Sequence, residues 1–161
     1  TGYQITASPV DGLKIGADYH ETSGQLSDTA LEASSGNVFA QYAAGNFKVG
    51  YSTGGYEPGL KDKNTAVTEY TNTSMGVEFA VNDALSVSYN DEEFEAKTNV
   101  AIAATASSNT KTTVTSEQET IQVAYNMGGA TLGIALIEVA NADYTAAKDE
   151  KKTIFTLAME F

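Results

Sequence analysis

The chain ends in the sequence TIFTLAMEF, residues 153–161, in which large and small side chains alternate. Side chains of an extended strand point alternately to its two faces. One face carries the large apolar groups Phe155, Leu157, Met159 and Phe161. The opposite face is smaller and ends in the charged Glu160. This pattern predicts a closing strand that turns one face toward a membrane.

The composition favours strands and excludes several kinds of site. The 161 residues include no Cys and one His, so the usual zinc sites are excluded and no metal or cofactor is expected. With 21 acidic and 9 basic residues, the net charge of −12 argues against nucleic acid as a partner. No apolar run reaches the roughly 18 residues that a spanning helix needs.

The alternation of the last stretch recurs along the whole chain and predicts nine strands. They cover residues 2–8, 13–20, 38–43, 47–52, 74–81, 85–90, 120–127, 132–136 and 153–161. Two adjacent apolar residues, Leu136 and Ile137, interrupt the alternation and predict a bulge or a change of register.

Short and long connections alternate between these strands. The short ones are turns at residues 9–12, 45–46, 82–83 and 128–129, and the long ones are loops near 23–35, 57–69, 96–117 and 141–150. Tight turns at one rim and long loops at the other are typical of a transmembrane barrel. We therefore predict an all-β fold for residues 1–161, a single antiparallel up-and-down barrel domain, present in part.

Aromatic residues near the strand ends separate this prediction from a soluble sheet. They lie on the apolar face, namely Tyr3, Tyr19, Tyr42, Phe47, Tyr51, Phe79, Tyr89, Tyr125 and Phe161. Rings with an apolar body and a wet edge gather at both membrane interfaces. Two alternatives stay open: a soluble β-sandwich, and a small structural or adhesive barrel that binds partners through its loops.

The terminal aromatic strand and the repeated hairpins resemble Gram-negative general porins. The resemblance implies a 16-stranded barrel in the outer membrane, of which this chain is the C-terminal half, with short periplasmic turns and long extracellular loops. It also implies a homotrimer in contact with outer-membrane lipid. Phe155, Leu157, Met159 and Phe161 would be the signal read by the barrel-assembly machinery. The family's constriction loop follows its third strand, a part that this sequence lacks.

The position of a residue in the alternation selects the side chains that would line such a channel. This candidate pore-lining set is Lys14, Asp18, His20, Lys48, Glu78, Gln122 and Glu160. Charges on a channel wall shape the field that solutes experience. The alternative is that they are ordinary solvated wall residues, and a wet pair such as Lys48 with Glu78 contributes little.

The remaining charged residues indicate no reaction. Asp91, Glu92, Glu93 and Glu95 form the densest acidic cluster, read either as a divalent-cation site or as the solvated base of a loop. No catalytic triad, paired carboxylate or phosphate-binding loop can be placed, so no enzyme is expected. We predict passive diffusion of small hydrophilic solutes and ions, with a weak preference for cations.

Overall fold

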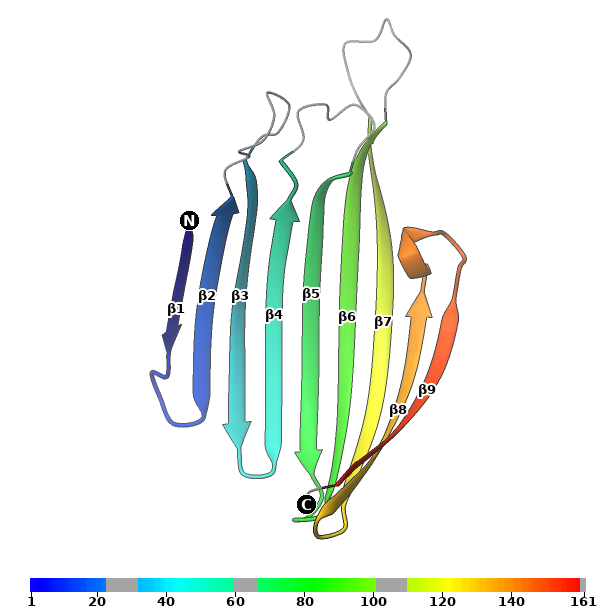
Figure 1. Ribbon diagram of the computed structural model, residues 1–161. Helices are drawn as coiled ribbons and strands as arrows, with labels where there is room; N and C mark the ends of the chain where they lie inside the picture. Colours follow the sequence, from blue (N-terminus) through cyan, green and yellow to red (C-terminus); the bar gives the residue numbers. More distant parts are fainter. Residues whose placement is uncertain (23–31, 60–66, 101–109, 160–161) are drawn as a thin grey trace, which may run out of the picture.

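The computed structural model describes residues 1–22, 32–59, 67–100 and 110–159. These residues form nine strands and one short 3₁₀ helix (Figure 1). The elements are β1 (Gly2–Ala7), β2 (Leu13–Thr22), β3 (Ala33–Ala44), β4 (Phe47–Glu57), β5 (Val67–Ala80), β6 (Leu85–Val100), β7 (Thr110–Asn126), β8 (Ala130–Ala140), η1 (Ala142–Tyr144) and β9 (Glu150–Met159). The described residues contain no helix long and apolar enough to span a bilayer.

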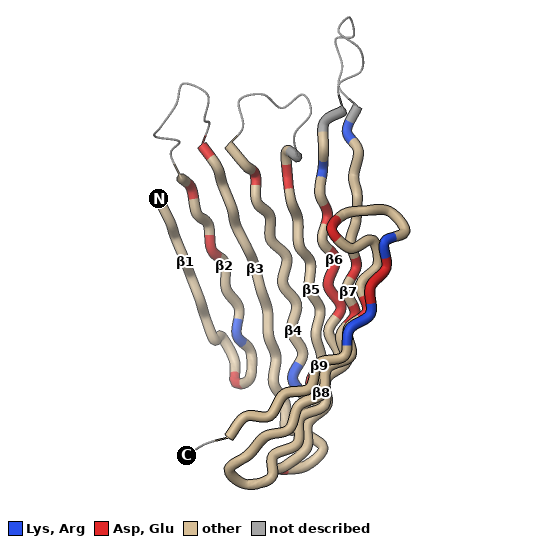
Figure 2. The backbone as a smooth tube through the Cα atoms, turned by 45° about the vertical axis from the view of Figure 1, so that its right-hand side comes forward, with Lys and Arg blue, Asp and Glu red and all other residues tan. Residues whose placement is uncertain are grey.

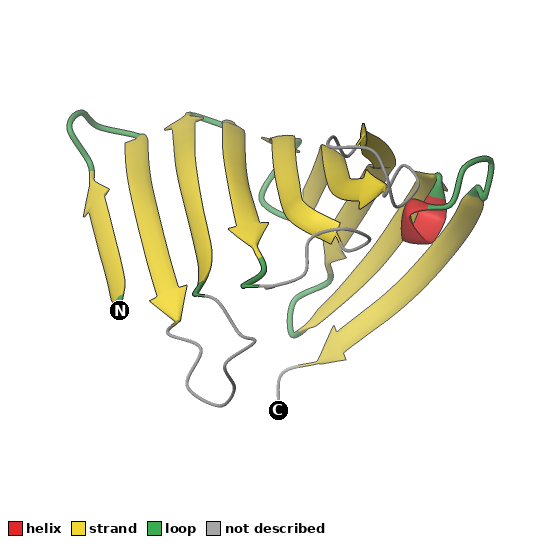
Figure 3. Cartoon of the chain, turned by 90° about the horizontal axis from the view of Figure 1, so that it is seen from above, coloured by secondary structure: helices red, strands yellow, loops and turns green. Residues whose placement is uncertain are grey.

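The strands form one antiparallel sheet in which each strand pairs with its neighbours in the sequence. The spatial order runs from β1 to β9 without a crossover, which confirms the predicted up-and-down arrangement. Within the described residues, β1 and β9 each pair on one side, so the sheet is not closed. Seen from above, the sheet curls, and β8 and β9 turn away from the direction of β1 and β2 (Figure 3).

The sheet does not pack against a second layer. A compact protein of 16.9 kDa exposes about 7,700 Å², whereas this chain exposes 10929 Å². Large apolar side chains remain exposed along all nine strands, Tyr3 at 69% and Phe155 at 70% among them. A β-sandwich needs two sheets whose apolar faces meet, so the soluble-sandwich alternative is wrong for the described part of the chain.

Short turns connect the strands at one end of the sheet, and three of them contain glycine with a positive φ. In two of these turns, Gly12 and Gly45 have φ values of 77° and 57°, which an L side chain adopts only with strain. In a third turn, the Asn82 side-chain oxygen accepts hydrogen bonds from the amides of Ala84 and Leu85, both at 2.9 Å. These turns keep the hairpins tight on this side.

The longest predicted loop is mostly strand. The sequence predicts a connection over residues 96–117, but β6 continues to Val100 and β7 starts at Thr110, with Phe94–Val100 paired to Thr110–Ser116. This part of the hairpin is polar on both faces, so the alternation that marks a half-buried strand disappears while the backbone pairing continues. The prediction of a loop was therefore wrong at both ends.

The predicted irregularity at Leu136 is also wrong. Ile121 pairs with Leu136 and Thr120 with Ile137 without a break, and the register toward β9 is equally regular. Ile137 is one of a few apolar side chains on the mainly polar face. A register shift occurs instead between Val67 and Glu69, where β5 meets β6.

Candidate functional site

The register divides the sheet into two faces of different chemistry, since residues directly opposite each other on paired strands share a face. One such row joins Phe47, Phe79, Val87, Val123, Ile134 and Phe155. The adjacent row on the other face joins Lys48, Glu78, Ser88, Gln122, Ala135 and Ile154. An apolar wall and a polar wall therefore lie back to back, one residue apart in the sequence.

The apolar residues form a band that crosses the sheet obliquely. On β2 the band is centred near residue 16, and on β9 it is centred near residue 157. Following the pairing from Gly16 across the sheet leads to Glu150, seven residues short of that centre. A shift of about 24 Å over about 34 Å of sheet inclines the band by about 35° to the perpendicular of the strands.

This inclination has a direct physical meaning. Strands of outer-membrane barrels are tilted by roughly 35–45° from the membrane normal. Strands tilted by the angle found here would bring the oblique apolar band parallel to a bilayer. One row illustrates the effect. It begins at the apolar Ile15 on β2 and ends at the charged Lys151 on β9, so it leaves the apolar band on the way across the sheet.

The predicted pore-lining residues share the polar face wherever the structure describes them. Lys14 and Gln41 pair directly, as do Asp18 and Asn37, and His20 and Ser35. Lys48, Glu78 and Gln122 lie together in the polar row given above. Glu160 and Phe161 lie outside the described residues. The shared face of these six residues follows from period-two alternation alone, and their role in a channel stays a prediction.

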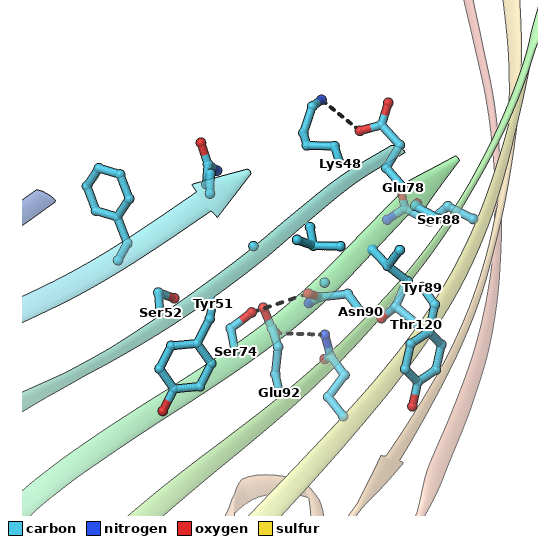
Figure 4. A pocket seen from close by; sticks show the side chains of 18 of the residues that line it. Lys48, Tyr51, Ser52, Ser74, Glu78, Ser88, Tyr89, Asn90, Glu92 and Thr120 are labelled. Carbon is cyan, nitrogen blue, oxygen red and sulfur yellow. Dashed lines mark hydrogen bonds and ion pairs between the residues drawn. The ribbon is translucent and has the colours of Figure 1, made fainter. Parts of the chain in front are cut away.

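A groove of about 490 Å³ lies on this polar face, between β3 and β8 (Figure 4). Its hydrogen-bonded side chains link neighbouring strands. Ser74 Oγ bonds Asn90 Oδ1 at 3.2 Å, and Gln118 Nε2 donates to Glu92 Oε2 at 3.2 Å. Small residues keep the wall open elsewhere, namely Gly50, Ser52, Gly76 and Ser88. The polar face is therefore the hollow side of the curled sheet.

The pair predicted at Lys48 is formed. Lys48 Nζ lies 2.9 Å from Glu78 Oε2, and the two side chains face each other across β4 and β5 (Figure 4). Their exposures of 54% and 45% show that the pair is wet. An exposed pair contributes at most about 1 kcal/mol to stability. Its main effect is to place opposite charges side by side on the polar wall.

The net charge of the chain does not come from the polar face. On that face the described strands carry three lysines and four carboxylates, namely Lys14, Lys48, Lys152, Asp18, Glu78, Glu92 and Glu150. The apolar face carries nine carboxylates on β2 and β4–β8, namely Glu21, Glu57, Glu69, Asp91, Glu93, Glu95, Glu117, Glu119 and Glu138. They lie toward the long-loop ends, beyond the apolar band (Figure 2).

The densest acidic cluster is part of this distribution and not the base of a loop. Asp91, Glu92, Glu93 and Glu95 lie within β6, and alternation sends Glu92 to the polar face and the other three to the opposite face. No group of three or more acidic or His side chains in the described residues could hold a metal ion. The divalent-cation interpretation therefore has no support in this part of the chain.

Sequence reasoning missed several polar-face residues because it ended the strands too early. Glu92 and Gln118 line the groove but fall just beyond the predicted strands of residues 85–90 and 120–127. Lys152 was overlooked because the predicted last strand starts at Thr153, whereas β9 starts at Glu150. A continuation of the period-two count from Tyr89 through the acidic residues of β6 would have placed Glu92 correctly.

The closing strand has the predicted face. Phe155, Leu157 and Met159 are exposed on the apolar side at 70%, 59% and 55%. They pair with Ile134, Leu132 and Ala130 of β8. The outer edge of β9 has no partner in the described residues, so its backbone groups remain available to a further strand.

Comparison with known proteins supports the architecture and no specific activity. No family model and no curated protein matches the chain. A solved porin structure, refined at 1.8 Å resolution, superimposes with a TM-score of 0.68 at 16% sequence identity. The match covers 99% of this chain and 50% of the porin chain, so the chain spans half the length of that porin. The nine strands therefore have the fold of a fragment of a porin barrel.

Proposed function

We propose that the chain forms about half of the wall of a water-filled channel in a bacterial outer membrane. Small hydrophilic solutes and ions would cross it by passive diffusion, without covalent chemistry. The oblique apolar band carries the proposal, because it sets one face of the sheet against lipid and leaves the polar face toward water. The porin-like fold supports the same assignment.

The proposal includes the orientation and the missing part of the barrel. An open sheet edge cannot face lipid, because its backbone groups would lack hydrogen-bond partners. The free edges of β1 and β9 would thus be joined by about seven further strands, completing the 16 of a general porin, with this chain as the C-terminal half. The short turns would be periplasmic and the long loops extracellular.

Three further parts of the proposal concern partners. Residues on the apolar band would contact outer-membrane lipid. The barrel-assembly machinery would recognise the closing strand through Phe155, Leu157, Met159 and Phe161. The complete barrel would assemble as a homotrimer. Cross-linking of the detergent-extracted protein tests the trimer, and a monomer would contradict it.

The alternative of a narrow structural or adhesive barrel is less well supported. Small barrels fill their interiors with interlocking side chains. The polar face of this sheet is lined instead by small residues, among them Gly16, Gly50, Gly76, Ser86, Ser88, Gly133 and Ala135. This lining favours an open passage.

Reconstitution of the full-length protein tests the channel directly. In planar bilayers we expect stepwise conductance increases that are ohmic. In a salt gradient we expect a small reversal potential, with the sign that indicates a weak preference for cations. The near balance of charge on the polar face is the reason for this weak selectivity. A folded protein that adds no conductance would contradict the proposed function.

Neutralising the Lys48–Glu78 pair should change selectivity in opposite directions. We expect Lys48→Met to raise the ratio of cation to anion permeability and Glu78→Gln to lower it, because each change leaves its partner's charge unpaired on the wall. The double variant should return close to the wild-type ratio, and the free energy of unfolding should change by less than about 1 kcal/mol in each case. Identical reversal potentials in all four proteins would remove the pair from the conducting path.

A further inference from the structure

The connection between β8 and β9 folds back over the polar face. It spans residues 141–149 and contains η1. The ring of Tyr144 in η1 lies 6.0 Å from the ring of Tyr70, which belongs to β5. Tyr70 pairs with Tyr56 and with Ala96, in the polar-face row that leads from His20 and Ser35. To reach β5 from β8, the connection must cross the inner sides of β7 and β6.

Burial marks the path of the crossing. Buried residues in the described part of the chain are Ala96, Ser116, Thr120 and Ala142, each exposed by 7% or less. Ala96 and Ser116 lie on the polar face of β6 and β7 beside the crossing, and Ala142 lies in η1, whereas Thr120 lies farther along β7 and lines the groove. Ala96 pairs with Tyr70 on the neighbouring strand. Its side chain is small, which leaves space for the ring of Tyr144 beside the ring of Tyr70.

Hydrogen bonds fix the connection to the wall. Asn141 Nδ2 donates to the Thr115 carbonyl at 3.1 Å, and Ser116 Oγ donates to the Ala140 carbonyl at 3.2 Å. Within the connection, the Asn141 side-chain oxygen accepts from the Ala147 amide at 2.9 Å. Lys148 forms an ion pair with Asp143. These hydrogen bonds attach the start of the connection to β7, and the contacts within the connection hold its two halves together.

The backbone of the connection is strained, which shows that these contacts determine its shape. Asn141, Asp143, Tyr144 and Ala147 all have positive φ values, between 51° and 60°. In non-glycine residues this backbone conformation is unfavourable and persists where the surroundings impose it. Burial raises the pKa of the Tyr144 hydroxyl, and Tyr70 adds to the effect. Both tyrosines are partly buried.

We infer that the β8–β9 connection constricts the channel from inside, and that the contact of Tyr144 with Tyr70 holds it against the wall. The inference rests on the proposed channel function. It assigns the size limit of this half of the barrel to a loop that carries an aromatic ring and the ion pair of Lys148 with Asp143. The constriction then discriminates by solute size.

Conductance tests the constriction. In the full-length protein, Tyr144→Ala and Tyr70→Ala should each raise the single-channel conductance by roughly a third or more, because the narrowest section sets the flow. Larger neutral sugars should enter proteoliposomes faster. Tyr144→Phe keeps the ring and should conduct like the wild type. Tyr125→Ala, the same change at an exposed residue of the apolar face, is the matched control and should leave conductance unchanged.

Thiol accessibility tests the position of the connection without using conductance. This chain contains no Cys, so Ala96→Cys introduces a thiol beneath the connection. A membrane-impermeant thiol reagent should modify it slowly in the otherwise wild-type protein and at least about tenfold faster when Tyr144→Ala is added. Thr112→Cys, exposed on the same face of β7, should react rapidly in both backgrounds. Heat-modifiable mobility on gels confirms that each variant is folded.

The two assays distinguish a failure of the proposed channel from a failure of the proposed constriction. A wild-type protein without conductance would contradict the channel, whereas the thiol assay would still report where the connection lies. Equal thiol reactivity at position 96 in both backgrounds would overturn the placement held by Tyr144. If Tyr144→Ala exposes a protected thiol at position 96 but leaves the conductance unchanged, the proposed constriction is wrong.

Discussion

Replacing Val123 by Arg is expected to abolish assembly of the folded barrel or to weaken it severely. Val123 lies in the middle of the apolar band, between Val87 on β6 and Ile134 on β8. An Arg on the lipid face near the bilayer midplane costs about 2–4 kcal/mol. We expect loss of the heat-modifiable form in outer-membrane fractions, or a matching fall in the free energy of unfolding in lipid vesicles.

The neighbouring residue provides a control for this change. Gln122→Arg introduces the same side chain one position earlier, on the polar face. It should assemble like the wild type and shift the reversal potential toward anions. If Val123→Arg assembles as well as Gln122→Arg, the apolar face does not contact lipid, and the membrane assignment is wrong.

Replacing Gly12 by Ala is expected to destabilise the barrel by about 2 kcal/mol or more. The left-handed conformation of Gly12 alone costs an alanine about 1–2 kcal/mol. In addition, a Cβ atom at Gly12 would lie 2.2 Å from the Ala43 carbonyl oxygen. The Ala43 amide donates a 2.9 Å hydrogen bond to the Gly12 carbonyl, so the two neighbouring turns cannot separate freely.

The turn between β3 and β4 offers a matched comparison. Gly45 also has a positive φ, but nothing lies within 4 Å of a Cβ placed there. Gly45→Ala should therefore show only the conformational cost, about 1 kcal/mol. Urea-induced unfolding in lipid vesicles gives both values. Equal losses in the two variants would mean that the contact between the turns contributes nothing.

The sequence was sufficient for the strand order and the two faces, because both follow from side-chain alternation. Lys48 and Gln122 lie 74 positions apart, yet period-two counting placed them on one face, and the register confirms this. However, polar and apolar side chains alternate along a strand only where one face meets water and the other does not. Where β6 and β7 extend beyond the apolar band, both faces are polar, and the prediction of a loop was wrong for residues 96–100 and 110–117, while residues 101–109 lie outside the described residues.

Contacts between distant elements could not be predicted from the sequence. Tyr70 and Tyr144 are ordinary members of a strand and a loop, and no spacing relates them. Their contact requires the pairing of four consecutive strands and a loop that bends inward. The inclination of the apolar band has the same origin, because it appears only when the register connects β2 to β9. Local sequence patterns therefore locate the strands, whereas the pairing register determines how their side chains combine on each face of the sheet.

The separation of charge between the two faces has a consequence for how such a protein can vary. Carboxylates beyond the apolar band determine the overall isoelectric point and how strongly the exterior repels other acidic particles. In the proposed channel, the near-balanced lysines and carboxylates of the hollow side would determine which ions pass. Because alternate residues of the same strands carry these two sets, surface charge and ionic permeability would then be independent variables that can be engineered separately.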